Sequence, residues 1–328
     1  MIRRSLLIAF GVYLLIALVI TYPLILNLST SLIGYVHGDA YEMAHHIWWI
    51  KHALQTGQNP FFAANLAYPD GINGMTLWAH PLQFFPAWLL AYVLPLPVAA
   101  NITVLITLAL NGTAVFGLAR YLLTAENTKN AEDEFSVLSP QSSVLLFASF
   151  LAGLVFMLYP TMQGHLGAGH AGLMVQWGVP IYVYGLFKLA EKPQRAVYIA
   201  LAALGFVLCS GGHILQLIYV VLPLTVVIAL AHLLRRDWQA LIRTVIAALI
   251  GSAIMLVFVL PVLSATVSTS AYEESGDTVR YSADLLAVVT PSFNHPLFGQ
   301  LDFTHRVLGI NLDEGALYVG VIGALLSL

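Results

Sequence analysis

Long apolar runs are the feature that most constrains how this chain folds. Residues 214–234 and 241–263 are almost wholly apolar, and a helix needs roughly 20 such residues to cross the hydrocarbon core of a bilayer. Of the 328 residues, 59% are hydrophobic and only 9% are charged, whereas an average soluble domain has about a quarter of its residues charged. A water-soluble fold of this length does not bury that much apolar side chain. The sequence therefore predicts a polytopic membrane protein.

The same runs predict an all-α transmembrane bundle, a single membrane domain over residues 1–328 with about eight spanning helices. The expected spans are 5–26, 99–123, 144–159, 173–189, 197–209, 214–234, 241–263 and 316–328. The last run stops in mid-span, so we expect the chain to be the N-terminal part of a longer protein. The run 197–209 is short and ends at Ser210-Gly211-Gly212-His213, which predicts a tight turn or a broken helix.

The first apolar run follows Arg3-Arg4, as the apolar core of a signal peptide or of a signal anchor does. No cleavage site of the small-x-small type comes after it, because Thr21-Tyr22-Pro23 stands there instead. We therefore interpret residues 5–26 as a retained signal anchor.

Charge sets the orientation of the predicted spans. The segment 81–97 is apolar but rich in proline, so it either crosses the membrane or is re-entrant or interfacial. If it does not cross, ten of the 13 lysines and arginines fall on the cytoplasmic side, and only Lys51, Arg280 and Arg306 lie outside. If it crosses, four lie inside and nine outside. The positive-inside rule favours the first arrangement, a multi-pass protein of the plasma membrane with a cytoplasmic N-terminus.

This orientation leaves two long extracytoplasmic loops, 27–98 and 264–315, and places ten of the 11 histidines on the outer side. Functional residues concentrate in loops held by a rigid scaffold, so we expect the chemistry at the extracytoplasmic face. The net charge of −3, without a basic block, gives no support for a nucleic-acid partner. The single cysteine, Cys209, excludes an internal disulfide.

The first outer loop starts with Gly38-Asp39 and continues into a predicted amphipathic surface helix over 42–56. Two stripes run along this helix, one apolar and one aromatic: Met43, Ile47, Ile50 and Leu54, and then His45, Trp49 and His52. Such a helix is expected to lie flat on the bilayer. Asp39 can cap the helix, with Glu42 completing a capping-box pattern, and the same carboxylate is well placed to accept a proton or bind a cation.

This layout resembles the GT-C superfamily of membrane glycosyltransferases, in which a signal-anchor span precedes a Gly-Asp, a large first outer loop with surface helices, and many further spans. The superfamily includes protein O-mannosyltransferases, catalytic subunits of oligosaccharyltransferase and lipid A aminoarabinose transferases. A nearer likeness is to a group of bacterial GT-C-like membrane proteins. It rests on these short motifs: Gly38-Asp39, Trp48-Trp49, Gln58-Asn59-Pro60-Phe61, Tyr68-Pro69-Asp70-Gly71, Gly164-His165, Gly169-His170 and Tyr281-Ser282-Ala283-Asp284-Leu285-Leu286.

The resemblance implies sugar transfer at the outer face, from a polyprenyl-phosphate donor to a lipid, glycan or protein acceptor, with membrane lipids around the spans. It also implies that the acidic residue of the first loop, here Asp39, is the catalytic base or a carboxylate linked to a metal. The chain departs from the pattern in two ways. It lacks the adjacent Asp-Glu pair of the mannosyltransferases, and it ends before the usual C-terminal spans and soluble domain.

A transferase of this kind needs a cationic group for the carrier phosphate and aromatic faces for the sugar. Arg280 is the preferred phosphate ligand, because a guanidinium can hold two phosphate oxygens. The alternative is a solvated loop arginine paired with a nearby carboxylate. His45, Trp49, Tyr281 and Asp284 complete the predicted phosphate and sugar sites, and an interface anchor is the alternative role for the tryptophan.

A divalent metal is a further expectation. His165 and His170 flank a glycine-rich outer turn, and with Asp39 they offer imidazole and carboxylate ligands that suit zinc, manganese or magnesium. The alternative is that both histidines are interfacial and hydrogen-bond to neighbouring loops. His80 and His213 are isolated in the sequence, and lone histidines are more often structural.

Two other classes of function stay open. Transporters and lipid flippases usually carry ionisable residues within their spans, which the predicted spans almost lack, but the interruption at 209–213 is typical of transport sites. The third interpretation is an inactive GT-C-like scaffold that assembles cell-surface glycans, because a fold does not guarantee its chemistry.

Overall fold

The computed structural model of the chain describes residues 2–36, 38–66, 69, 71–73, 79–130, 140–192, 194–268, 284–293, 295, 297–309 and 318. This part of the protein is helical. Its only strands are β1 (Phe62–Ala63) and β2 (Ile72–Asn73), which pair antiparallel. The predicted last span, 316–328, lies outside the described residues apart from Tyr318.

Long helices alternate with short helical turns. The α-helices are α1 (Ile2–Ile20), α2 (Ala40–Thr56), α4 (Pro81–Leu90), α5 (Leu96–Asn130), α6 (Pro140–Leu158), α7 (Pro160–Ala168), α8 (Gly178–Glu191), α9 (Ala196–Gly212), α10 (Ile214–Gln216), α11 (Leu222–Leu234), α12 (Trp238–Ser268) and α14 (Asp302–Leu308). Two 3-10 turns and one π-helical turn accompany them: η1 (Leu24–Leu26), η4 (Leu285–Val288) and η2 (Leu217–Val221). The helices α4, α6 and α7 each begin with a proline, whose fixed φ suits the first helical turn.

Three described stretches are long and apolar enough to cross a membrane. They are Leu96–Ala125 in α5, Ile214–Leu234 from α10 to α11, and Trp238–Ser264 in α12. Two helices bent by 41° relative to each other make a fourth if they are taken as one span: Ser143–Leu158 and Pro160–Ala168. The apolar helices Arg4–Ile20 and Ala196–Gly212 are shorter. The described residues thus contain helices of membrane-spanning length, but fewer of them than the sequence predicted.

The predicted span 173–189 is wrong at its start, because α8 begins only at Gly178. The buried side chain of Asn111 on α5 explains the difference. Its Nδ2 donates to the Met174 carbonyl over 2.8 Å, and its Oδ1 accepts from the Gln176 amide over 3.2 Å. These bonds satisfy backbone groups that a helix would otherwise pair, so the chain before α8 runs in turns.

Two other predicted spans differ in length from the helices observed. Instead of running over 5–26, α1 ends at Ile20, where both the amide and the hydroxyl of Thr21 donate to the Ala17 carbonyl and Pro23 follows. In contrast, α5 extends beyond both ends of the predicted span 99–123.

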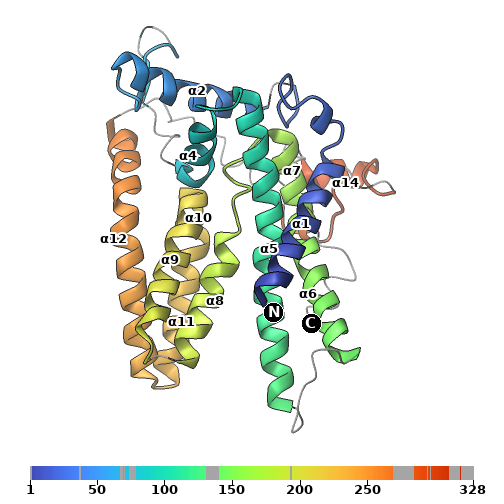
Figure 1. Ribbon diagram of the computed structural model, residues 1–328, viewed down its shortest axis with the longest axis vertical. Coiled ribbons are helices and arrows are strands. Elements are labelled where there is room, and N and C mark those ends of the chain that lie inside the picture. Colours follow the sequence, from blue (N-terminus) through green and yellow to red (C-terminus); the bar gives the residue numbers. More distant parts are fainter. Residues whose placement is uncertain are drawn as a thin grey trace.

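The long helices lie side by side, and α2 lies across one end of them (Figure 1). Helix α4 lies beneath α2 and contacts both α2 and α5. The α8–α9 and α11–α12 turns lie at the opposite end of the bundle, which we call the basic end (Figure 1). The helix ends and turns there carry most of the described basic side chains: Lys188, Lys192, Arg195, Arg235, Arg236 and Arg243.

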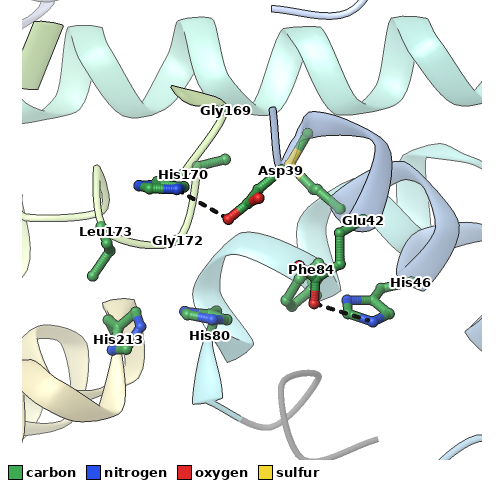
Figure 2. Close-up of a pocket in the computed structure, with 12 residues that line it drawn as sticks. Asp39, Glu42, His46, His80, Phe84, Gly169, His170, Gly172, Leu173 and His213 are labelled. Atoms are coloured by element: carbon green, nitrogen blue, oxygen red, sulfur yellow. Dashed lines mark ion pairs between the residues drawn. The ribbon is translucent and has the colours of Figure 1, made fainter. Parts of the chain in front are cut away.

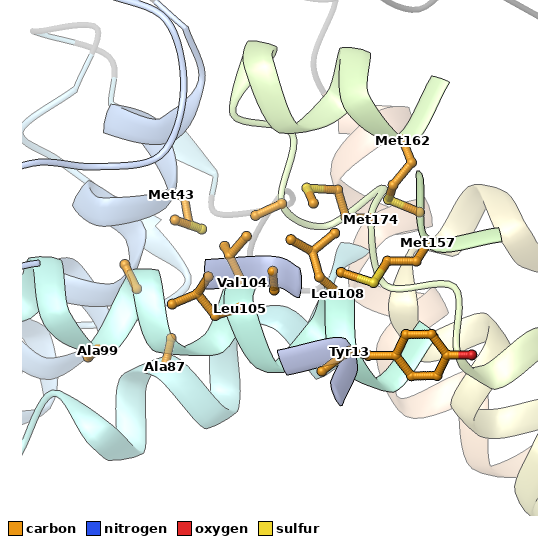
Figure 3. Close-up of a cluster of buried hydrophobic side chains, with 14 of the residues drawn as sticks. Tyr13, Met43, Ala87, Ala99, Val104, Leu105, Leu108, Met157, Met162 and Met174 are labelled. Atoms are coloured by element: carbon orange, nitrogen blue, oxygen red, sulfur yellow. The ribbon is translucent and has the colours of Figure 1, made fainter. Parts of the chain in front are cut away.

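Two clusters of buried apolar side chains hold the bundle together. The first lies around Tyr13, where α1, α5 and α6 meet, and the Tyr13 hydroxyl donates to the Phe150 carbonyl over 2.8 Å (Figure 3). Gly112 faces the Tyr13 ring so closely that a Cβ at this position would overlap it. The second cluster joins α8, α9, α11 and α12 around Phe206. In the first cluster, the absence of a side chain at Gly112 lets the Tyr13 ring lie between neighbouring helices.

The helix predicted over 42–56 is confirmed as α2, but its apolar stripe faces protein rather than lipid. Met43, Ile47 and Ile50 are buried, whereas Leu54 at the end of the stripe is exposed. The reason is that α4 and α5 pack against α2. Protein contacts therefore fix the start of α2, where Gly38-Asp39 stands.

Candidate active site

A cavity of about 300 Å³ opens where α2 crosses the end of the bundle (Figure 2). Its walls come from the starts of α2 and α4, from the loop after α7 and from the break between α9 and α10. Half of the lining residues have titratable side chains, and Met43, Phe84 and Leu173 add apolar surface. The titratable residues are Asp39, Glu42, His46, His80, His170 and His213. Two carboxylates and four imidazoles from distant parts of the chain thus meet in one cavity.

Asp39 pairs with His170 across the cavity, with 2.9 Å between Asp39 Oδ2 and His170 Nε2 (Figure 2). Asp39 stands at the N-cap position of α2, but its backbone is helical (φ −73°, ψ −1°) and its side chain makes no capping hydrogen bond. A capping residue normally has an extended backbone. The predicted capping role is therefore wrong, and the carboxylate lies against His170 instead. The Asp39 side chain is still 58% exposed.

Glycines let the loop after α7 approach the start of α2. Helix α7 ends at Ala168, and Gly169 follows in the left-handed region with a φ of 81°. A Cβ on Gly169 would lie 2.5 Å from the Ala40 amide nitrogen, and one on Gly38 would lie 2.6 Å from the Ala168 carbonyl oxygen. The two segments therefore touch where only glycine fits, which brings the carboxylate and the imidazole together.

His165 lies behind His170 and does not line the cavity. The Nδ1 atoms of the two histidines are 3.4 Å apart, and Nε2 of His170 faces Asp39, so the His170 ring lies between its two partners. His165 is buried on α7. The prediction that His165 lies in a glycine-rich turn is wrong, because α7 continues past His165 and ends only at Ala168.

One turn further along α2, Glu42 and His46 form a second carboxylate–imidazole pair, with 3.7 Å between Oε1 and Nε2. Burial raises the pKa of Glu42, and the neighbouring Asp39 carboxylate raises it further. Burial lowers the pKa of His46 to about 4, and His45 adds to the effect. His46 is therefore uncharged at pH 7.

His80 and His213 face each other edge to face, with ring centroids 4.0 Å apart. Nδ1 of His80 is buried without a hydrogen-bond partner among the described residues, and it lies against Gly172, where a Cβ would overlap it. Burial lowers the pKa of both histidines, to about 4 for His213. The two histidines are isolated in the sequence, but the fold brings them into the same cavity.

The helix break predicted at 209–213 is confirmed, and it falls at His213. Helix α9 continues through Gly212, and His213 is extended (φ −155°, ψ 139°). Its Nδ1 accepts a hydrogen bond from the Leu215 amide over 3.0 Å and so starts α10. The break thereby places an imidazole in the cavity wall.

None of the other predicted substrate-binding residues that the structure describes lines this cavity. Arg280 and Tyr281 lie outside the described residues. Asp284 caps η4 with its side chain. His45 and Trp49 lie on α2 but do not line the cavity, and Trp49 is only 3% exposed. The cavity thus contains the predicted catalytic residue and one further predicted metal ligand.

Within the described residues, no group of three or more His, Cys, Asp or Glu side chains is arranged to hold a metal ion. The three predicted ligands follow one another, with His170 between Asp39 and His165, and they do not surround a common point. The divalent metal stays a prediction.

Sequence reasoning did not assign four cavity residues to the site: Glu42, His46, His80 and His213. For two of them a signal was present, because Asp39, Glu42 and His46 are spaced three and four residues apart and so share one helix face. His80 and His213 come together only through packing of distant segments, and no local spacing reveals such a pair.

Comparison of the chain with protein families, with curated proteins and with solved structures found no match. A functional proposal for this chain therefore depends on the residues of the cavity.

Proposed function

We propose that the chain is a polytopic membrane enzyme of the GT-C type that transfers a sugar from a polyprenyl-phosphate donor to an acceptor at the extracytoplasmic face. The observation that carries the proposal is the Asp39–His170 pair, which lines a cavity at one end of an apolar helical bundle. The resemblance to GT-C enzymes assigns catalysis to the same aspartate.

Asp39 has the features that a general base requires. Its side chain is 58% exposed, so an acceptor hydroxyl can reach it. Its position is fixed from two sides, by the ion pair with His170 and by its own amide, which donates to the Ala168 carbonyl over 2.9 Å. A positioned general base typically accelerates a reaction by about 10²–10⁴-fold.

In the proposed reaction the acceptor hydroxyl gives its proton to Asp39 while its oxygen attacks the anomeric carbon of the donor sugar. The bond from that carbon to the phosphate oxygen breaks, and polyprenyl phosphate leaves with the bonding electron pair. Attack from the face opposite the leaving group inverts the anomeric centre. His46 and His213 supply neutral hydrogen-bonding imidazoles for sugar hydroxyls, because burial keeps them uncharged at pH 7.

The proposed orientation places the cavity outside the cell and the basic end in the cytoplasm. No lysine or arginine of the described residues lines the cavity, whereas the opposite helix ends carry most of them. This separation of charge is the pattern that the positive-inside rule expects of a membrane protein in that orientation.

Asp39→Asn tests the proposal most sharply. We expect transfer of radiolabelled sugar from a polyprenyl-phosphate pool to endogenous acceptors in membranes to fall by about 10²–10⁴-fold. Asparagine has nearly the size and shape of aspartate, and Asp39 makes no capping hydrogen bond, so the substitution removes the base and leaves the local fold. Asp237→Asn is the matched control, because Asp237 also directly precedes a helix, α12, and does not line the cavity.

Equal labelling by wild-type and Asp39→Asn membranes at matched protein levels would contradict the proposal. An equal loss of labelling in Asp237→Asn membranes would contradict it as well, because the loss would then not depend on the cavity.

A transporter or lipid flippase is the second candidate, and the helix break at His213 in the cavity wall favours it. Interrupted helices are common at transport sites. A transporter or flippase moves the lipid-linked sugar across the membrane of sealed vesicles and forms no glycosylated acceptor. An inactive scaffold gives neither result. Measuring lipid-linked sugar and product in the same vesicles therefore separates the three classes.

A further inference from the structure

A second hollow, of about 370 Å³, lies at the basic end between the start of α9 and the start of α12. Gln194, Ala196 and Ile199 form one wall, and α12 forms the other. The α12 residues are Gln239, Ile242, Arg243 and Ile246, whose spacing places them on one helix face. No carboxylate of the described residues lines this hollow. Its charged group is therefore a single uncompensated guanidinium.

Arg243 lies within an apolar helix of membrane-spanning length, Trp238–Ser264. It stands five residues after Trp238, about 7–8 Å along the helix axis at 1.5 Å per residue. Among the described residues it has no hydrogen-bond or ion-pair partner. The Asp237 carboxylate, six residues earlier in the chain, accepts a hydrogen bond from the Ala240 amide over 3.1 Å. An unpaired charge inside a spanning helix is costly, and such a residue is a candidate for a functional site.

Two amide side chains share the hollow with this arginine. Gln194 and Gln239 likewise have no hydrogen-bond partner among the described residues. One guanidinium and two amide groups thus offer N–H donors without a competing negative charge. This combination fits a phosphate group, which accepts several charge-assisted hydrogen bonds at once.

An exposed apolar stripe runs along α12 from the hollow toward the middle of the helix. Ile242, Ile246, Leu249 and Ile250 are 57%, 39%, 64% and 43% exposed, and their spacing places them on one face. In a bilayer such a face contacts acyl chains. The hollow therefore joins an anion-binding end to an apolar surface, which suits an amphipathic ligand better than a free anion.

We propose that this hollow binds the phosphate headgroup of an anionic membrane phospholipid, with Arg243 as its cationic ligand and the acyl chains along the α12 stripe. The site is separate from the Asp39 cavity at the other end of the bundle. It depends on the membrane placement of the helices and not on sugar transfer. The cytoplasmic leaflet is rich in anionic lipid, and the basic end faces it in the orientation proposed above.

The test uses the full chain purified in detergent and titrated with phosphatidylglycerol, with phosphatidylcholine or with inorganic phosphate. Native mass spectrometry counts the bound lipid. We expect phosphatidylglycerol to bind more tightly than phosphatidylcholine and to resist displacement by inorganic phosphate. Arg243→Gln is expected to weaken phosphatidylglycerol binding about fivefold. Arg235→Gln removes the same charge at the same end but outside the hollow, and it is expected to leave this binding unchanged.

Equal weakening by the two substitutions would overturn the proposal, because the lipid would then respond to general surface charge. Unchanged binding in Arg243→Gln, or full displacement by inorganic phosphate, would also overturn it. If Arg243→Gln does not fold, Ile246→Trp fills the hollow and keeps the charge. We expect that variant to lose phosphatidylglycerol binding too, and unchanged binding would overturn the proposal.

Discussion

Helices α2 and α12 each begin directly after an aspartate, at opposite ends of the bundle. Asp237 does what this position predicts, because its Oδ1 accepts a hydrogen bond from the Ala240 amide over 3.1 Å. Asp39 makes no such bond, and its carboxylate lies 2.9 Å from His170. The same residue type in the same position therefore caps a helix at the basic end and pairs with a histidine in the cavity.

Backbone geometry explains the difference. The φ and ψ of Asp39 are already helical, and its amide is bonded to the Ala168 carbonyl in the loop after α7. The carboxylate is thereby directed across the cavity and not at the first turn of α2. An acidic residue that leaves an available structural role unused is a candidate for function, because natural sequences break local rules mainly at functional sites.

Beyond the loss of transfer expected in Asp39→Asn, the largest expected effect is on the acid stability of the cavity end. The pKa of His46 is lowered from 6.5 to about 4, so the unfolded chain takes up a proton below pH 6.5 while the folded chain does not. Stability therefore falls as the pH drops from about 6.5 to 4, by up to about 3 kcal/mol for this group, and levels off below that. Thermal unfolding in detergent at a series of pH values measures the slope.

His46→Gln removes this titration, so we expect a shallower acid slope, of which His80 and His213 keep a part because burial lowers their pKa values too. His305→Gln is the control, since His305 lies on α14 and does not line the cavity. An acid slope that is the same in wild type and His46→Gln would show that burial of this histidine does not limit stability.

A second, slightly smaller effect concerns the orientation of Asp39. His170→Ala removes the donor that holds the carboxylate, and a misplaced catalytic group typically costs about 10²-fold in rate. We expect sugar transfer to fall by that factor, while the amount of folded protein in the membrane stays the same. Transfer at the wild-type rate would mean that the pair does not position the base.

The smallest expected effect is a difference in stability between alanine variants of the two aspartates. Asp237→Ala removes a helix cap and is expected to lower the free energy of unfolding by about 1 kcal/mol. Asp39→Ala removes no cap, so its cost is expected to be smaller, limited to an exposed pair. Unfolding midpoints in detergent compare the variants. A larger loss in Asp39→Ala than in Asp237→Ala would reverse the comparison.

Much of the fold follows from local sequence pattern. The apolar runs predict α5, α11 and α12, and the glycines before His213 predict the break after α9, because both signals act over a few neighbouring residues. The start of α8 does not follow from such patterns. It depends on Asn111, a residue of another helix, whose side chain bonds the turns before Gly178.

The candidate site divides in the same way. The place of Asp39 after the first apolar run predicts a functional role for this residue, and the Gly169-His170 motif predicts the histidine that pairs with it. That the two lie together depends on glycines of two loops packing against each other. Helical spacing could have added Glu42 and His46. The meeting of His80 with His213 is a tertiary contact that local spacing does not encode.

Cysteine labelling from one side of the membrane tests most directly whether the two ends of the bundle face opposite compartments. Cys209 is the only cysteine and is buried, so Cys209→Ser provides a background without a reactive thiol. Gln58→Cys reports on the α2 end and Arg235→Cys on the basic end, and both positions are exposed. In intact cells a membrane-impermeant maleimide is expected to label Gln58→Cys at once, and Arg235→Cys only after permeabilisation. Labelling of both variants in intact cells, or of Arg235→Cys alone, would contradict the orientation on which the sugar-transfer and lipid-binding proposals depend.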